Sequence, residues 1–261
     1  MELYSFGKTD VGMKRKINQD SIVCREELRL FVVADGMGGH KAGEIASGIV
    51  IDSMVRFIKA TEEDKNITWP FPYDDRYSYE ANRLAVSIKI ANQLIFHESQ
   101  AEESFKGMGS TVVAVLFSEA TAHIAHVGDS RIYRIREKAI EQMTEDHSLL
   151  NMEMKRRKMS EEEIKNFPYK NVITRALGSK ESVDVDIREE ILRPRDLYLL
   201  CSDGLSGLVE AEEIRDILVQ DPENLESAGT RLVDMANERG GIDNISVVIA
   251  GTHLPGKWKK N

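Results

Sequence analysis

The chain has 261 residues, of which 41% are hydrophobic and 30% are charged, and its formal net charge at pH 7 is −9. This length fits one large domain or two small ones and is sufficient to bury a substantial core. The acidic balance argues against extensive nucleic-acid binding, which needs a basic face. Cys24 and Cys201 lie far apart in sequence, which excludes a disulfide framework and suits a reducing compartment. Without a long apolar run or an apolar N-terminal signal, the sequence predicts a cytoplasmic protein.

The apolar residues follow helical spacing in some stretches and strand-like spacing in others. An amphipathic helix is predicted over 42–58, and a second one is predicted through the stripe from Leu84 to Ile95. Two more helices are predicted near Ile214–Leu218 and Leu225–Met235. Short β-branched runs between turn residues predict strands at 21–24, 29–34, 111–117, 122–127, 132–135, 184–191, 197–201 and 245–251.

The order of these elements predicts the fold class. Clusters of strands joined by short links favour antiparallel hairpins, and helix pairs separate the clusters. This pattern predicts an α+β domain with sheets inside and helices outside. Residues 59–79 contain two prolines and many charges and are predicted to form a long loop. The aromatic side chains of this loop could form a docking surface for another protein, but we favour the alternative that they pack against the domain itself. Residues 149–171 are predicted to be a charged, mostly helical excursion in which Ser160 and Glu163 form a capping box.

Aspartates recur at the ends of the predicted strands. Asp35, Asp129 and Asp203 follow apolar strands, whereas Asp20 and Asp243 stand just before strands. Any one of these aspartates could simply be a turn residue, because Asp-Gly favours tight turns. Together they predict a rim of carboxylates, which needs a cation because like charges raise each other's pKa. Oxygen ligands without His or Cys favour Mg²⁺ or Mn²⁺, and two such ions suit a phosphoryl hydrolase that uses a metal-bridged water.

A series of short motifs carries a family resemblance. They occur in the order RKINQD, DGMGGH, GMGSTVVA, VGDSRIY, TEDHS, ITRALG, CSDGLS and DNIS. This set resembles the type 2C metal-dependent protein serine/threonine phosphatases, and in particular their bacterial single-domain branch. The resemblance implies a four-layer α-β-β-α sandwich of two antiparallel sheets flanked by helix pairs. It implies one catalytic domain over 1–254, with a flap at 149–171, a long loop at 59–79 and a short basic tail at 255–261.

The resemblance also implies which residues bind metal. Asp35 is expected to bridge two Mn²⁺ or Mg²⁺ ions, with the Gly36 carbonyl as a further ligand. Asp203 and Asp243 are expected to be the other carboxylate ligands. Asp20 is expected to hold a metal through water.

The resemblance implies a functional role for three further residues, and each role has a simpler structural alternative. Asp129, together with Asp203, matches a third metal site, although Asp129 could instead pair with Arg131. Arg15 is expected to clamp the phosphate with its planar guanidinium, the alternative being a merely solvated side chain. His40 is expected to protonate the leaving seryl or threonyl oxygen, the alternative being that it only begins a helix.

Other motif residues are expected to be structural. Asn244 is expected only to cap the turn that positions Asp243. His147, Thr174 and Arg175 are expected to support the base of the flap.

The sequence therefore predicts a cytoplasmic phosphatase that hydrolyses phosphoserine and phosphothreonine in proteins without a covalent phosphoenzyme. Its expected partners are phosphorylated proteins and a cognate serine/threonine kinase, with no nucleic acid and no membrane, and the chain is expected to be a monomer. One alternative is a narrow regulatory phosphatase of an anti-anti-sigma-type protein. The other is a non-catalytic phosphopeptide-binding scaffold of the same fold, against which the intact Asp35, Asp203 and Asp243 argue.

Overall fold

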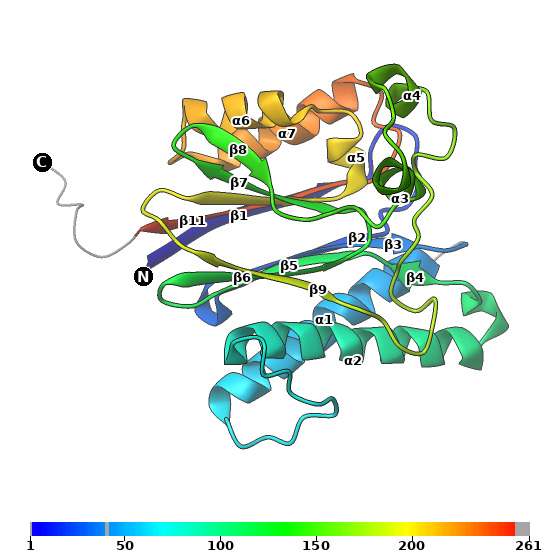
Figure 1. The fold of residues 1–261 in the computed structure, drawn as a ribbon, viewed down its shortest axis with the longest axis vertical. Coiled ribbons are helices and arrows are strands. Elements are labelled where there is room, and N and C mark those ends of the chain that lie inside the picture. Colours follow the sequence, from blue (N-terminus) through cyan, green and yellow to red (C-terminus); the bar gives the residue numbers. More distant parts are fainter. Residues whose placement is uncertain (1, 40–41, 254–261) are drawn as a thin grey trace, which may run out of the picture.

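Two antiparallel sheets lie face to face and each is covered by helices on its outer side (Figure 1). The computed structural model describes residues 2–39 and 42–253. The first sheet has the order β1-β11-β10-β7-β8, formed by Glu2–Asp10, Ile245–His253, Leu197–Cys201, Arg131–Arg136 and Ala139–Gln142. The second has the order β2-β3-β5-β6-β9, formed by Asp20–Arg25, Leu30–Met37, Val112–Phe117, Thr121–Val127 and Asp186–Ile191. The short strand β4 (Gly109–Ser110) pairs with β3.

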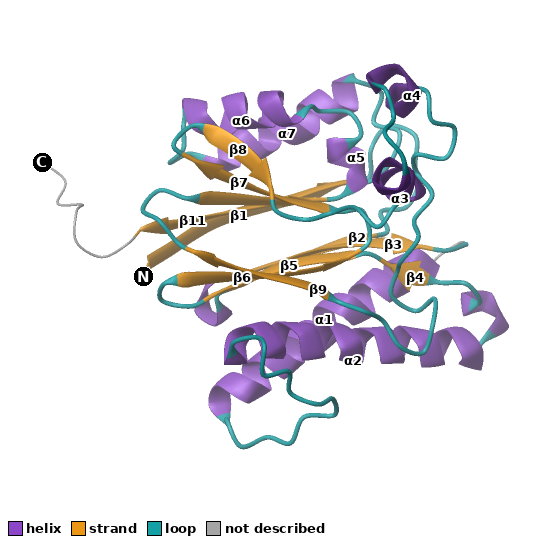
Figure 2. Ribbon diagram, in the orientation of Figure 1, coloured by secondary structure: helices purple, strands orange, loops and turns teal. Residues whose placement is uncertain are grey.

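The helices form the two outer layers (Figure 2). Helices α1 (Ala42–Glu63) and α2 (Tyr79–Ala101) pack on the second sheet, and α6 (Ala211–Gln220) and α7 (Leu225–Glu238) pack on the first. This arrangement confirms the four-layer α-β-β-α sandwich. Short helices complete the chain: η1 (Glu26–Leu28), η2 (Glu103–Phe105), α3 (Leu149–Arg156), α4 (Glu161–Lys165) and α5 (Asp203–Ser206). Within the described residues, no helix has both the length and the apolar character needed to cross a membrane.

Aromatic and β-branched residues fill the space between the two sheets. Phe31 and Phe117 from the second sheet meet edge to face with ring centroids 5.6 Å apart, and Tyr198 from the first sheet packs against Phe117 at 5.4 Å. All three side chains are buried. Because apolar burial is the main favourable term in folding, this central layer fixes how the two sheets face each other and therefore how their ends meet.

Several element boundaries differ from those expected from the sequence. Strand β1 was not anticipated, and β9 begins at Asp186 rather than at residue 184. Helix α1 continues to Glu63 and α2 begins at Tyr79, so the loop between them is 64–78. In that loop Trp69 lies within 6 Å, centroid to centroid, of three rings, at 5.7 Å from Phe57, 5.9 Å from Tyr73 and 5.3 Å from Tyr79, which supports the packing interpretation.

The flap contains two short helices, each with a serine cap. Ser148 accepts a hydrogen bond from the Asn151 backbone N–H at the start of α3. Ser160 and Glu163 form the expected capping box at the start of α4. The basic tail expected at 255–261 lies outside the described residues.

Candidate metal centre

Asp20 and Asp35 occupy directly opposite positions in the antiparallel pair of β2 and β3. Asp20 begins β2, and Asp35 lies near the end of β3, followed by the buried Gly36. Side chains that are direct partners in such a pair point to the same face. The register therefore places two carboxyl groups side by side at one rim of the second sheet.

Asp203 and Asp243 come from the first sheet at the same rim. Asp203 begins α5 two residues after β10 ends, and Asp243 stands two residues before β11. The two segments touch, because a Cβ on Gly204 would lie 1.9 Å from the Asn244 carbonyl oxygen. Only glycine fits at that position, which explains the Asp-Gly pair after the strand.

Asp129 lies in the turn after β6 and is buried. Its pKa rises to about 7, mainly because of burial and then because of repulsion from Asp203 and Asp146. Arg131, the alternative partner considered from the sequence, pairs with Asp146 at 2.7 Å. Within the described residues, the buried Oδ1 of Asp129 has no hydrogen-bond partner.

The electrostatics of these carboxyl groups favour a cation. Burial raises the pKa of Asp35 well above its usual range, and repulsion from Asp20, Asp203, Asp129 and Asp243 raises it further. Burial also raises the pKa of Asp203, with a further rise from Asp243 and an opposing hydrogen bond with Asp35. Uncompensated buried charges of one sign are unstable, so the group needs either protons or positive charge.

Asp20 is positioned by a serine that sequence reasoning did not single out. The Ser202 hydroxyl donates to Asp20 Oδ2 at 2.8 Å and accepts from the Ser246 backbone N–H at 3.0 Å. The pKa of Asp20 still rises to about 6, because burial outweighs the hydrogen bonds from Ser246 and Ser202. Asp20 Oδ1 is buried without a partner in the described part of the chain. A polar residue directly after an apolar strand, as Ser202 is, was the available signal.

These observations test whether the residues fit a divalent metal. The donors are hard carboxylate oxygens, which suit Mg²⁺ or Mn²⁺. The pKa values of Asp20 and Asp129 are raised, and each of these two residues keeps one buried oxygen without a partner among the described residues. The residues present therefore fit a metal centre.

Arg15 lies at the edge of this cluster. Its Nη2 donates to Asp243 Oδ2 at 2.7 Å, while 53% of its side chain remains exposed. The hydrogen bond to Asp243 raises the pKa of Arg15, and Asp35 and Asp203 add to the rise. The guanidinium thus stands beside the carboxylates and remains accessible to solvent. His40, the expected proton donor, lies outside the described residues.

A cleft extends from the carboxylates towards the flap. It has a volume of about 400 Å³ and connects Asp129, Asp203 and Asp243 with flap residues such as Leu150 and Ile164. Residues of the 149–171 segment therefore line the same cleft as these carboxylates.

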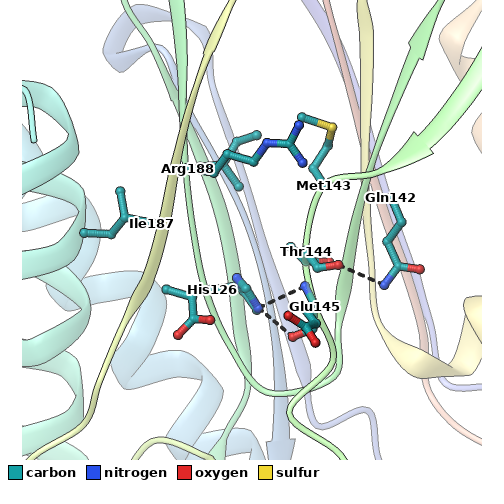
Figure 3. Close-up of a pocket in the computed structure, with 9 residues that line it drawn as sticks. His126, Gln142, Met143, Thr144, Glu145, Ile187 and Arg188 are labelled. Atoms are coloured by element: carbon teal, nitrogen blue, oxygen red, sulfur yellow. Dashed lines mark hydrogen bonds between the residues drawn. The ribbon is translucent and has the colours of Figure 1, made fainter. Parts of the chain in front are cut away.

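A second group of possible ligands lies elsewhere, beside a cavity of about 330 Å³ whose lining includes His126 and Asp186 (Figure 3). Ligand atoms of His126, His147 and Asp186 lie within 4.8 Å of one another, so a metal is geometrically possible there. However, His147 Nδ1 accepts from the Gly128 N–H at 3.0 Å, so neutral His147 carries its proton on Nε2, 3.4 Å from Asp186 Oδ2.

A backbone carbonyl engages His126, and the side chain of Arg175 engages Asp186. His126 Nε2 lies 2.9 Å from the Glu145 carbonyl oxygen, and Arg175 pairs with Asp186. His147 further accepts, through its carbonyl, the Thr174 N–H at 2.8 Å. These bonds agree with the structural role expected at the base of the flap for His147 and Arg175.

Comparison with known proteins places the chain in a family. A family model for protein phosphatase 2C matches residues 13–246. Protein phosphatase PhpP of Streptococcus pneumoniae is 37% identical over 244 residues, which cover 92% of this chain and 94% of that protein. Serine/threonine phosphatase stp of Listeria monocytogenes is 33% identical over 259 residues, which cover 97% of each protein.

Solved structures agree. The serine/threonine phosphatase PstP/Ppp of Mycobacterium tuberculosis matches with a TM-score of 0.84 at 32% identity, over 96% of this chain and 99% of that one. A catalytic domain of PstP in complex with 2 manganese ions matches with a TM-score of 0.79 at 34% identity, over 96% and 98% of the two chains.

Two antiparallel sheets between helical layers, with an acidic rim where the sheets meet, define a metal-dependent protein phosphatase. The chain belongs to the protein phosphatase 2C family, among its bacterial members with a single catalytic domain. It is a serine/threonine protein phosphatase and acts on phosphoproteins. The family, fold class and activity predicted from the motifs are thus confirmed.

Proposed function

We propose that Asp35, Asp203 and Asp243, with the Gly36 carbonyl, hold two Mn²⁺ or Mg²⁺ ions for the hydrolysis of phosphoserine and phosphothreonine. The observation that carries this proposal is the convergence of carboxyl groups from both sheets, where burial and then repulsion raise the pKa of Asp35. The solved relative with two manganese ions supports it. We assign Asp20 to a metal contact through water, and Asp129 with Asp203 to a third metal.

Arg15 serves this reaction by holding the phosphate. Bound divalent cations supply the positive charge that lowers the pKa of water and offsets charge on the phosphoryl oxygens. Arg15 adds a permanently charged guanidinium whose Nη2 is fixed against Asp243. A guanidinium has further N–H groups, and its planar fork can donate two parallel hydrogen bonds to the oxygens of a phosphate. His40 supplies the proton for the leaving seryl or threonyl oxygen.

The physiological context follows from this chemistry. We propose that the substrates are the phosphoproteins of a cognate serine/threonine kinase and that the enzyme acts as a cytoplasmic monomer. Cys24 and Cys201 are free thiols, which suits a reducing compartment. Phosphoproteins that accumulate in a deletion strain, and that the purified enzyme dephosphorylates, identify its substrates. Accumulation of a single regulatory protein favours a narrow role.

The test is phosphate release from a phosphothreonine peptide by the purified protein with Mn²⁺, compared with the same assay in EDTA. We expect turnover only with metal. Asp203→Asn lowers turnover by more than about 100-fold, because it removes a ligand charge. Asp234→Asn, on the exposed face of α7, is the matched control and leaves turnover unchanged. Full activity in EDTA, or in Asp203→Asn, contradicts the proposal.

A further inference from the structure

The side chain of Asn244 joins the two ends of the loop that carries Arg15. Asn244 is 4% exposed, and its Nδ2 donates to the Val11 carbonyl at 2.9 Å and to the Ile17 carbonyl at 3.0 Å. Its Oδ1 accepts from the Gln19 N–H at 2.9 Å. Both amide hydrogens and the amide oxygen are therefore used, and all three bonds go to the backbone of one short segment.

The segment between those ends is exposed but rests on the chain next to Asp243. The Gly241 carbonyl accepts hydrogen bonds from the Met13 and Lys14 N–H groups at 2.8 and 3.1 Å. Gly12 has φ +78°, and a Cβ there would lie 2.1 Å from the Asp243 carbonyl oxygen. The loop that carries Arg15 thus lies against the segment that contains Gly241 and Asp243.

We propose that Asn244 is a positioning residue that fixes Arg15 for phosphate binding, beyond the turn-capping role expected from the sequence. This inference rests on the proposed role of Arg15. A long guanidinium side chain loses conformational freedom when it binds, so a fixed loop lowers the cost of ordering it against the phosphate. The Asn244 backbone N–H, not its side chain, donates to Asp243 Oδ1 at 2.8 Å. Substitution of the side chain therefore leaves that contact with the metal-ligand carboxylate in place.

The test is a double-mutant cycle with Asn244→Ala, Arg15→Ala and the double variant, assayed on a phosphothreonine peptide at saturating Mn²⁺. We expect Asn244→Ala to raise KM about 5- to 30-fold with a smaller change in kcat. In the Arg15→Ala background, Asn244→Ala is expected to change KM less than about twofold, because the group that it positions is gone. The Mn²⁺ concentration for half-activation stays within about twofold of wild type.

Asn82 offers a matched control. It is also buried, and its amide likewise fastens a loop, accepting from the Asp74 N–H at 2.8 Å and donating to the Asp74, Tyr77 and Ser78 carbonyls. That loop lies beyond the outer helical layer, away from the acidic rim (Figure 1). Asn82→Ala is expected to lower Tm as Asn244→Ala does, and to leave KM unchanged.

Each outcome distinguishes the inference from the proposed function. A large KM effect of Arg15→Ala with none from Asn244→Ala overturns the inference alone. An equal fold-loss from Asn244→Ala in both backgrounds also overturns it, because Asn244 then acts independently of Arg15. No effect of Arg15→Ala contradicts the proposed phosphate contact itself. If Asn244→Ala does not fold, Asn244→Ser, which keeps a hydroxyl for one of the three bonds, enters the same cycle with the same criteria.

Discussion

Asp20 and Asp35 face each other across the β2–β3 pair, one at the start of its strand and the other near the end of its own. Like charges at directly opposite positions destabilise a strand pair. Burial, and then repulsion from Asp20, Asp203 and Asp129, raises the pKa of Asp35 well above its usual range. The chain therefore carries an electrostatic cost at this rim that a divalent cation relieves.

Replacement of Asp35 by asparagine is expected to stabilise the metal-free protein while abolishing its response to metal. Asparagine removes one buried charge from the cluster, so the free energy of unfolding rises by about 1 kcal/mol, or about 2–4 °C in Tm. Mn²⁺ raises the Tm of the wild type by mass action but not that of Asp35→Asn. Differential scanning calorimetry with Mn²⁺ and with EDTA measures both effects.

Asp52→Asn is the control for this experiment, because Asp52 is an exposed carboxylate on α1. It is expected to leave both the metal-free Tm and the Mn²⁺ shift unchanged. A full Mn²⁺ shift in Asp35→Asn is incompatible with a ligand role for Asp35.

Replacement of Tyr198 and of Tyr133 by phenylalanine, both in the first sheet, is expected to change stability in opposite directions. The buried Tyr198 hydroxyl has no hydrogen-bond partner in the described part of the chain, whereas the Tyr133 hydroxyl accepts from Arg131 at 3.1 Å. Tyr198→Phe is expected to raise the free energy of unfolding by about 1 kcal/mol, and Tyr133→Phe to lower it by about 1 kcal/mol. Urea unfolding measures both values. A loss of stability in Tyr198→Phe contradicts the conclusion that the Tyr198 hydroxyl is buried without a hydrogen-bond partner.

His147 is expected to contribute a loss of stability on mild acidification, opposite in sign to the contribution of Asp20 and Asp129, whose pKa values folding raises. Burial, together with repulsion from the neighbouring His126 and Arg175, lowers the pKa of His147 to about 4. Between that value and the ordinary histidine pKa of about 6.5, the unfolded state binds the extra proton, so the free energy of unfolding rises with pH. The stabilisation is present above pH 6.5 and is lost towards pH 4, at up to about 1.4 kcal/mol per pH unit.

The variant His147→Asn isolates this contribution. Asparagine retains a side-chain oxygen near the position of Nδ1 for the Gly128 N–H but does not titrate in this range. As the pH falls from 7 to 4.5, the urea midpoint of the wild type is expected to fall relative to that of His147→Asn. The exposed His97 on α2 is the control, and His97→Asn keeps the wild-type slope. Equal slopes for His147→Asn and wild type exclude His147 as the source.

Trp69→Ala separates packing from docking in the 64–78 loop. Trp69 contacts Phe57 and Tyr79 of the helical layer, so its loss is expected to cost about 2 kcal/mol of stability. Phosphopeptide and phosphoprotein turnover are expected to stay within about twofold of wild type. An unchanged Tm together with a raised KM on a phosphoprotein indicates a docking surface instead.

The strands that precede an aspartate could be predicted from the sequence because an apolar run and a turn dipeptide stand side by side there. In YLLCSDG a continuous buried run stops at a turn dipeptide, and β10 ends at Cys201 as expected. Strand β1 escaped prediction because Glu2–Asp10 lacks a β-branched run and is nowhere fully buried along its described pattern. Its strand conformation depends on pairing with β11, whose residues lie at the other end of the chain.

Contacts between distant residues were likewise beyond the reach of local patterns. Ser202 bonds Asp20 across 182 positions, and Asn244 bonds Val11 across 233. The motif DNIS identified Asp243 as a ligand candidate, but only the fold shows that the next residue holds the loop of Arg15. Only the structure shows that Arg131 forms its ion pair with Asp146, because the sequence could not distinguish Asp129 from Asp146 as the partner.

The position of β11 between β1 and β10 has a consequence for biosynthesis. Ribosomes deliver the chain from its N-terminus, so an interior strand of the first sheet is the last described strand to emerge. The second sheet, complete once β9 has been made, can form co-translationally. In the first sheet, β1 must wait for β11, its strand partner among the described residues. Asp243 lies two residues before this final described strand, so its carboxyl group is expected to join the acidic rim only after β11 has been made.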